Sequence, residues 1–223
     1  MSYADPLLNS LGAPWQDVAS TLATLVPFNR GTGFFVNARG DFVSALHVTD
    51  GCPRPALQTP EGILVGTLIA TSAPLDIAVI GTGRTRTTYA RFPDYPVQWL
   101  MEAVAIGRYR ACGGLDSWSV TTATATSMLM FGQGSIALAA ADPIANGNSG
   151  SPVIDRSGAV IGMVFARLER MSETGIAVDA TTMTRFLDAA GVPYQTLPSV
   201  LLMAPESSGV SAAQYTFPVV CLL

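Results

Sequence analysis

The sequence predicts an all-β protein made of antiparallel strands, arranged as barrels or as a sandwich. From Ser20 onward, short apolar runs recur and are separated by turn residues at intervals of roughly 8–12 residues. Val, Ile, Thr and Phe dominate these runs, and apolar and polar residues often alternate within them, as they do along strands with one buried face. Regular strand spacing without helical patterns between the strands is typical of these two architectures.

The expected strands all share this short, β-branched and aromatic character. They are Thr21–Phe28, Gly33–Asn37, Phe42–Leu46, Ile63–Ala70, Ile77–Ile80, Ala103–Ile106, Val120–Phe131, Ser135–Ala139, Val153–Ile154, Val160–Ala166 and Gly175–Val178. One segment departs from the pattern, because its apolar residues between Met183 and Ala190 recur at helical spacing. Asp179 is a candidate N-cap and Gly191 a candidate stop, so a short helix is expected there.

The composition excludes several classes of protein. Of the 223 residues, 49% are hydrophobic and 13% charged, and the net charge is −4, which argues against a nucleic-acid surface. The longest apolar stretches fall short of the roughly 20 residues that span a bilayer. The first residues have neither the basic start nor the apolar core of a signal peptide, so we expect a cytoplasmic protein without membrane contact.

The three cysteines, Cys52, Cys112 and Cys221, are odd in number and widely spaced. They show no metal-ligand pattern, and the chain holds a single histidine, so neither a metal nor another cofactor is expected. A reducing interior is therefore the simplest compartment for this protein.

Two residues with catalytic potential lie at strand boundaries. His47, the only histidine, follows the strand expected at Phe42–Leu46, where a histidine is more often structural than catalytic. Asp76 opens the apolar run Leu75–Ile80 and has two interpretations. It is either a turn residue just outside the strand or a buried acceptor that orients the imidazole of His47.

Ser149 lies in the segment Asn146–Pro152, between Gly147 and Gly150. A nucleophile must project from a tight turn, and glycine permits the positive φ angles that such a turn requires. The alternative is a plain Asn-Gly turn. Taken together, a histidine, an aspartate and a serine in this order, each in a fitting local context, predict a catalytic triad.

At these motifs the chain resembles the chymotrypsin/trypsin-like serine protease superfamily, and more narrowly the bacterial HtrA/Deg-type peptidase domains. The resemblance covers roughly residues 20–191. It is carried by the segments Gly31–Val36, Ala45–Val48, Leu75–Val79, Gly147–Val153, Gly158–Gly162 and Gly175–Val178.

The resemblance implies two six-stranded antiparallel barrels that meet at a cleft, followed by a short C-terminal helix. Residues 1–19 form an irregular lead-in, and residues 20–105 form the first barrel with His47 and Asp76. Residues 106–191 form the second barrel, with Ser149, and the helix. Residues 192–223 are an unassigned tail that is too short for the PDZ domain found after many HtrA-type proteases.

The resemblance also implies the role of each site residue. His47 is the base, Asp76 orients it, and Ser149 attacks a peptide carbonyl whose oxyanion is bound by the backbone N–H groups of Gly147 and Ser149. The specificity pocket is lined by Ile144, Ala145, Val164, Phe165, Ala166, Gly175, Ile176 and Ala177. This lining is apolar, so we expect cleavage after small or medium apolar residues; if Asp142 points inward, a basic residue is preferred instead.

Asn148 replaces the aspartate that precedes the serine in digestive trypsins, so activation through a new N-terminus is not expected. A trypsin-like protease without this switch needs another restraint, and the high apolar content and the unassigned tail motivate the hypothesis of control by a protein partner or by oligomerisation. The substrate is a protein or peptide, and the oligomeric state stays open. Two alternatives remain: an inactive pseudoprotease that serves as a binding scaffold, and a viral polyprotein-processing serine protease.

Overall fold

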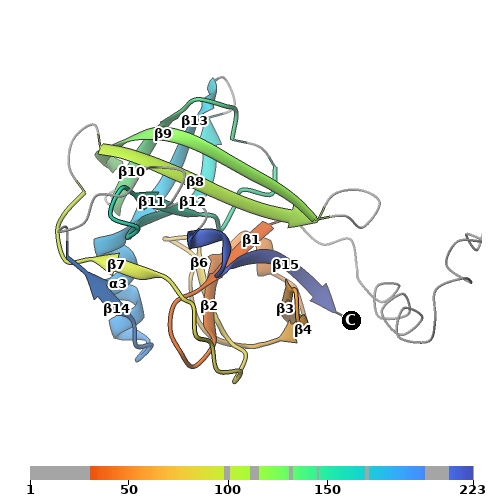
Figure 1. Ribbon diagram of the computed structural model, residues 1–223. Coiled ribbons are helices and arrows are strands. Elements are labelled where there is room, and N and C mark those ends of the chain that lie inside the picture. Colours follow the sequence, from red (N-terminus) through yellow and green to blue (C-terminus); the bar gives the residue numbers. More distant parts are fainter. Residues whose placement is uncertain are drawn as a thin grey trace, which may run out of the picture.

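The computed structural model describes residues 31–97, 101–110, 116–130, 133–144, 146–168, 171–198 and 211–222. A curled seven-stranded sheet packs against a closed six-stranded barrel, and the longer helix lies at their side (Figure 1). The predicted lead-in and the strand expected at Thr21–Phe28 lie outside the described residues. The prediction of an all-β protein is confirmed.

The first sheet is antiparallel and has the strand order β4-β3-β15-β1-β2-β6-β5. Its strands are β1 (Gly31–Phe35), β2 (Asp41–Ala45), β3 (Arg54–Thr59), β4 (Gly62–Val65), β5 (Thr67–Ser72), β6 (Ile77–Gly81) and β15 (Thr216–Leu222). We expected a six-stranded barrel here and observe a sheet that curls into half a barrel.

The curl has a local cause at Gly66. The two edge strands of the sheet, β4 and β5, follow each other in the chain with only this glycine between them. A Cβ on Gly66 would lie 2.2 Å from Cγ2 of Ile80, so only glycine lets the chain pass this close to β6. The apolar run expected as one strand, Ile63–Ala70, is therefore bent into two.

The second unit is a closed barrel with the strand order β10-β13-β12-β11-β8-β9, as predicted. Its strands are β8 (Met101–Arg110), β9 (Asp116–Met130), β10 (Gln133–Ala140), β11 (Pro152–Asp155), β12 (Val160–Leu168) and β13 (Met171–Asp179). Strand β8 crosses the expected boundary between residues 105 and 106; it pairs with β9 over its whole length and with β11 at residues 103–105.

Alternation along the barrel strands produces two cores. On β11, Val153 faces the barrel interior, whereas Ile154 packs with the first sheet. In the same way Ile161 of β12 lies inside the barrel and Val160 outside it. The outer face of the barrel and the inner face of the sheet thus share one core, which fixes the two units against each other.

Two helices lie wholly within the part of the chain that the structure describes. Helix α3 (Ala180–Ala189) begins at the predicted N-cap, since Asp179 accepts a hydrogen bond from the N–H of Thr182 at 2.7 Å. It ends before Gly191, whose φ of 65° is in the left-handed region. The other helix, α2 (Leu46–Thr49), is a single turn that follows β2 and was not predicted.

A small parallel sheet joins the connection between the two units to the segment after α3. It consists of β7 (Arg91–Pro93) and β14 (Gln195–Leu197). No helix among the described residues is long and apolar enough to cross a membrane.

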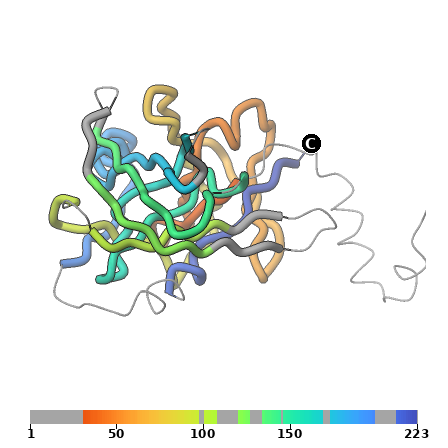
Figure 2. The backbone as a smooth tube through the Cα atoms, turned by 90° about the horizontal axis from the view of Figure 1, so that it is seen from above, coloured from red at the N-terminus to blue at the C-terminus, as the bar shows by residue number. Residues whose placement is uncertain are grey.

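The C-terminal tail, left unassigned from the sequence, contributes β15, an interior strand of the first sheet. It lies between β1 and β3, antiparallel to both, beside strands from the start of the chain (Figures 1 and 2). All seven of its residues are buried, and the ring of Phe217 contacts the ring of Phe35 edge to face. The tail is therefore an integral part of the sheet that carries His47.

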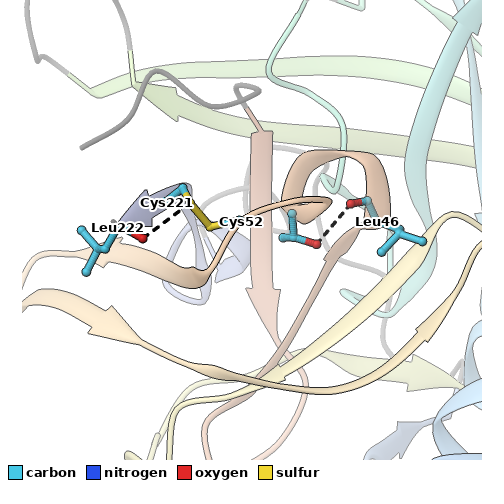
Figure 3. The surroundings of a disulfide bond; sticks show 5 residues. Leu46, Cys52, Cys221 and Leu222 are labelled. Carbon is cyan, nitrogen blue, oxygen red and sulfur yellow. Dashed lines mark hydrogen bonds between the residues drawn. A yellow bond between two sulfur atoms is a disulfide. The ribbon is translucent and has the colours of Figure 1, made fainter. Parts of the chain in front are cut away.

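Two of the three cysteines form a disulfide, which was not anticipated from the sequence. Cys52, in the loop after α2, forms a disulfide with Cys221 of β15 (Figure 3). A separation of 169 residues gave no sign of the pairing, because only the insertion of β15 beside β3 brings the two cysteines together. The cysteines thus give no support to a reducing compartment, since disulfides persist in oxidising ones.

Candidate active site

His47 and Asp76 are brought together by the pairing of β2 with β6. Ala45, the last residue of β2, pairs with Ile77, the first residue of β6, so the residues that flank this pair meet at the end of the sheet. One carboxylate oxygen of Asp76 lies 2.5 Å from Nδ1 of His47, and the other accepts the backbone N–H of His47 at 2.9 Å. The carboxylate thus holds both the ring and the backbone of the histidine.

The backbone of Asp76 is in the left-handed region, with φ at 53°, the one such residue besides glycine in the described part of the chain. Its carbonyl accepts the N–H of Leu46 at 3.0 Å, and its own N–H donates to Ala73 at 3.2 Å. Aspartate tolerates this conformation better than most residues, because its short side chain can bond locally. Both interpretations of Asp76 hold in part: it lies in a turn just outside the strand, and it binds the imidazole.

The electrostatics of this pair suit a general base. The hydrogen bond from Asp76 is the main cause that raises the pKa of His47 above 6.5; partial burial opposes it, and the negative charge of Asp76 adds to it. The side chain of His47 is 45% exposed and that of Asp76 22%. The imidazole is therefore oriented on one side and accessible on the other.

Ser149 lies in a turn just before β11, with glycines where the backbone needs them. Gly147 has a φ of 104° and Gly150 a φ of 86°. A Cβ on Gly150 would lie 1.9 Å from the backbone oxygen of Thr32, so only glycine fits at this position. Asn148 is fully buried and Ser149 is half-buried, so the turn directs alternate side chains inward and outward.

Thr32 on β1 ties this turn to the first sheet. Its N–H donates to the carbonyl of Ser149 at 2.8 Å, and its hydroxyl donates to the carbonyl of Gly147 at 2.8 Å. Gly33, its neighbour, pairs with Ser44 of β2, the strand that leads into α2 and His47. The turn with Ser149 is therefore anchored to the strand beside the one that positions His47.

Sequence reasoning missed the role of Thr32. The segment Gly31–Val36 contributed to the family resemblance, but nothing in its pattern indicates a contact with a turn 115 residues away. Ser44 was missed in the same way; its hydroxyl donates to the carbonyl of Thr32 at 2.7 Å and so fixes Thr32 itself.

The N–H groups of Gly147 and Ser149 are available to a ligand. In the part of the chain that the structure describes, neither donates a hydrogen bond, although both carbonyls are engaged by Thr32. A backbone N–H without an acceptor is rare in a buried residue such as Gly147. Such groups are what an oxyanion site requires.

The residues expected to line the specificity pocket differ in exposure. Ile144, Val164, Gly175, Ile176 and Ala177 are buried, Phe165 and Ala166 are half-buried, and Ala145 lies outside the described residues. Cδ1 of Ile144 lies 2.2 Å from the position that a Cβ on Gly175 would take. Ile144 therefore fills the space above the one residue of β13 that has no side chain.

Strand β12 runs from the turn with Ser149 past this apolar cluster. The carbonyl of Val164 accepts the N–H of Gly150 at 2.7 Å, and its N–H donates to Ser151 at 2.9 Å. Beyond Val164, β12 pairs with β13. On its other side, the pairing of β12 with β11 extends no further than Met163, which lies opposite Pro152, the first residue of β11. Among the described residues, no three His, Cys, Asp or Glu side chains lie close enough to hold a metal ion.

The site thus consists of a His–Asp pair on a curled sheet and a glycine-flanked serine on the six-stranded barrel that packs against it. The chain belongs to the family of trypsin-like peptidase domains, whose model matches residues 31–163. This confirms the resemblance inferred from the motifs.

Solved structures with the same fold are HtrA-type proteases and a mycobacterial protease. The active form of the Rv3671c protease from M. tuberculosis is 20% identical, with a TM-score of 0.64, and the match covers 88% of this chain and 91% of that one. The HtrA-type protease AlgW, solved with a decapeptide, is 19% identical, with a TM-score of 0.62, over 72% of this chain and 51% of that one.

One curated relative matches as well. It is the uncharacterized protein y4bJ of Sinorhizobium fredii, 28% identical over 159 residues. The match covers 70% of this chain and 25% of the relative, so the chain spans about a quarter of that protein's length.

Proposed function

We propose that the chain is a serine endopeptidase that cleaves protein or peptide substrates through an acyl-enzyme intermediate. The observation that carries the proposal is that the Asp76 carboxylate is hydrogen-bonded to both the ring and the backbone N–H of His47. Membership of the trypsin-like peptidase family and the fold of HtrA-type proteases support the same activity.

In the proposed reaction, neutral His47 accepts the hydroxyl proton of Ser149 as its oxygen attacks the substrate carbonyl. Asp76 keeps Nδ1 protonated and stabilises the imidazolium that forms. The imidazolium then gives its proton to the leaving amine as the peptide C–N bond breaks. Water attacks the acyl-enzyme in the second half of the reaction and frees Ser149.

The negative oxygen of each tetrahedral intermediate is bound by the N–H groups of Gly147 and Ser149. Their lack of acceptors supports this role. The loss of one such donor typically costs about 2.7–4 kcal/mol of transition-state stabilisation. Thr32 donates to the carbonyls of Gly147 and Ser149 and so fixes the peptide units that follow each of these two residues, which restrains the turn as a whole.

The pocket beside Ser149 favours small or medium apolar residues before the cleaved bond. Ile144 occupies the space above Gly175, and both residues are buried. A long substrate side chain would therefore collide with Ile144. Asp142 is exposed, and its N–H donates to the hydroxyl of Thr121, so its segment is tied to β9. This placement gives no support to a basic preference.

Control by a protein partner or by oligomerisation remains part of the proposal. The cytoplasmic location expected from the sequence does not, because the disulfide between Cys52 and Cys221 is typical of an oxidising compartment. The turn with Ser149 depends on contacts with β1, so a ligand that shifts the sheet relative to the barrel alters the oxyanion site. Purified protein that cleaves casein at full rate with no added factor would exclude such control.

The activity is tested by hydrolysis of fluorescent casein. We expect cleavage by the wild-type chain and none by Ser149→Ala, whereas Ser72→Ala, on the edge strand β5, retains it. Cleavage that persists in Ser149→Ala refutes the assignment of the nucleophile. If the wild-type chain cleaves nothing but still binds peptides, the result supports the alternative of an inactive pseudoprotease that serves as a binding scaffold.

A further inference from the structure

Arg167 lies beside the residues expected to line the specificity pocket. It belongs to β12, three residues after Val164, which is hydrogen-bonded to the turn of Ser149. Its Nη1 donates to the carbonyl of Ile144 at 3.3 Å, across the space between β12 and the segment that leads into that turn. Its backbone pairs with Gly175, the residue that Ile144 covers.

The charge of Arg167 is not neutralised within the part of the chain that the structure describes. Arg39, Arg86 and Arg156 each form an ion pair with a carboxylate, whereas no described carboxylate lies within 4 Å of the Arg167 guanidinium. A guanidinium offers five N–H donors in a planar fork that matches a carboxylate. One donor is used on Ile144, and because the residue is exposed, the remaining ones face solvent.

The pocket itself cannot accept the carboxylate that this fork would bind. Ile144 and Val164 are 2% and 1% exposed, and burying an ionised group among such side chains is costly. A carboxylate must therefore meet Arg167 at the surface, from a substrate residue next to the one that enters the pocket.

We propose that Arg167 selects substrates with aspartate or glutamate within three residues on the N-terminal side of the small apolar residue that precedes the cleaved bond. This inference rests on the proposed function for the direction of the substrate. The chain as a whole carries a net charge of −4 and repels acidic peptides at long range, so the selection depends on a local contact.

The test compares short peptides with a central alanine that differ only by glutamate or glutamine in the three preceding positions. In the wild-type background we expect kcat/KM to be roughly three- to tenfold higher for the glutamate peptide, a ratio that falls as salt rises. Arg167→Gln brings the ratio to about one, and Arg167→Glu inverts it. Arg185→Gln, an exposed arginine on α3, is the matched control and keeps the wild-type ratio.

Binding of the same peptides to Ser149→Ala, alone and combined with Arg167→Gln, separates this inference from the proposed function. A glutamate preference in binding that disappears with Arg167→Gln supports the inference even if no variant cleaves. Equal kcat/KM values for both peptides in the wild-type chain, or a preference that survives Arg167→Gln, overturn it while the peptidase assignment stands. Circular dichroism of each variant shows that the fold is retained.

Discussion

Asp76 holds His47 at two points with a single carboxylate: one oxygen lies 2.5 Å from Nδ1 of the ring, and the other accepts the backbone N–H at 2.9 Å. The hydrogen bond from the backbone N–H of His47 holds the Asp76 carboxylate whatever the orientation of the imidazole ring. Asp76 therefore stays in place whether or not the imidazole carries a second proton.

The first prediction concerns the dependence of activity on pH. A general base must be neutral, and Asp76 raises the pKa of His47, so kcat/KM should rise with pH and reach half its plateau above pH 6.5. Asp76→Asn should shift this midpoint downward and lower kcat by about 10⁴-fold, as the same replacement does in a serine-protease triad. A midpoint unchanged in Asp76→Asn contradicts the assigned role.

The same shift has a consequence for stability. A raised pKa in the folded state means that the folded chain holds the proton of His47 more tightly than the unfolded chain does. The resulting stabilisation is present below the unfolded pKa of histidine and is lost as pH rises through the folded pKa. In urea unfolding, the free energy of unfolding of the wild type should therefore exceed that of Asp76→Asn, and this difference should shrink on going from acidic to alkaline pH.

A second prediction addresses Thr32. Thr32→Val keeps the shape of the side chain but removes the donor to the carbonyl of Gly147, so the turn of Ser149 loses a buried hydrogen bond. We expect kcat to fall roughly tenfold, with KM little changed, since an unsatisfied buried group costs about 1–3 kcal/mol. Thr32→Ser retains the hydroxyl and should restore most of kcat. If the serine variant is as impaired as the valine variant, the hydroxyl is not the cause.

A third prediction separates the cost of backbone strain from the cost of a steric clash when a glycine is replaced by alanine. Gly150 and Gly191 both have positive φ angles, but a Cβ at Gly150 meets the oxygen of Thr32, whereas nothing lies within 4 Å of a Cβ at Gly191. In both alanine variants, the strained backbone conformation should lower the free energy of unfolding by about 1–3 kcal/mol. Gly150→Ala must also displace Thr32, so its unfolding midpoint should be clearly lower and its peptidase activity lost. Equal urea midpoints for Gly150→Ala and Gly191→Ala would show that the turn of Ser149 can move away from Thr32 without cost.

Much of this fold follows from local sequence patterns. Alternating β-branched and aromatic residues located most strands of the barrel, and the spacing around Phe186 with the cap at Asp179 located α3, because these signals depend only on neighbouring residues. His47, Asp76 and Ser149 were found for a related reason, since each stands next to a motif that is compact in sequence.

The features that could not be predicted arise from contacts between distant segments. Strand β15 is defined by its partners β1 and β3 rather than by its own pattern, and the pairing of Cys52 with Cys221 depends on it. The anchoring of the Ser149 turn by Thr32 has the same origin. Likewise, nothing in the run Ile63–Ala70 indicated that it bends at Gly66 to pass Ile80.

A fourth prediction concerns the disulfide. It joins the loop after α2 to β15 and closes a long loop, so its loss should lower the free energy of unfolding by about 2–5 kcal/mol. Cys52→Ser and Cys221→Ser should show the same drop in melting temperature, and reducing agent should lower the wild-type value equally. Cys112→Ser, the matched control, should melt like the wild type under both conditions. A wild-type melting temperature that ignores reducing agent contradicts the pairing.

The central claim, that Ser149 is a nucleophile activated by His47, is tested most directly by intact-mass measurement after incubation with a fluorophosphonate. We expect one adduct per wild-type chain, located on Ser149 by peptide mapping, with labelling abolished in Ser149→Ala and strongly slowed in His47→Ala. The absence of an adduct on the folded wild-type chain, or an adduct on another residue, would contradict it.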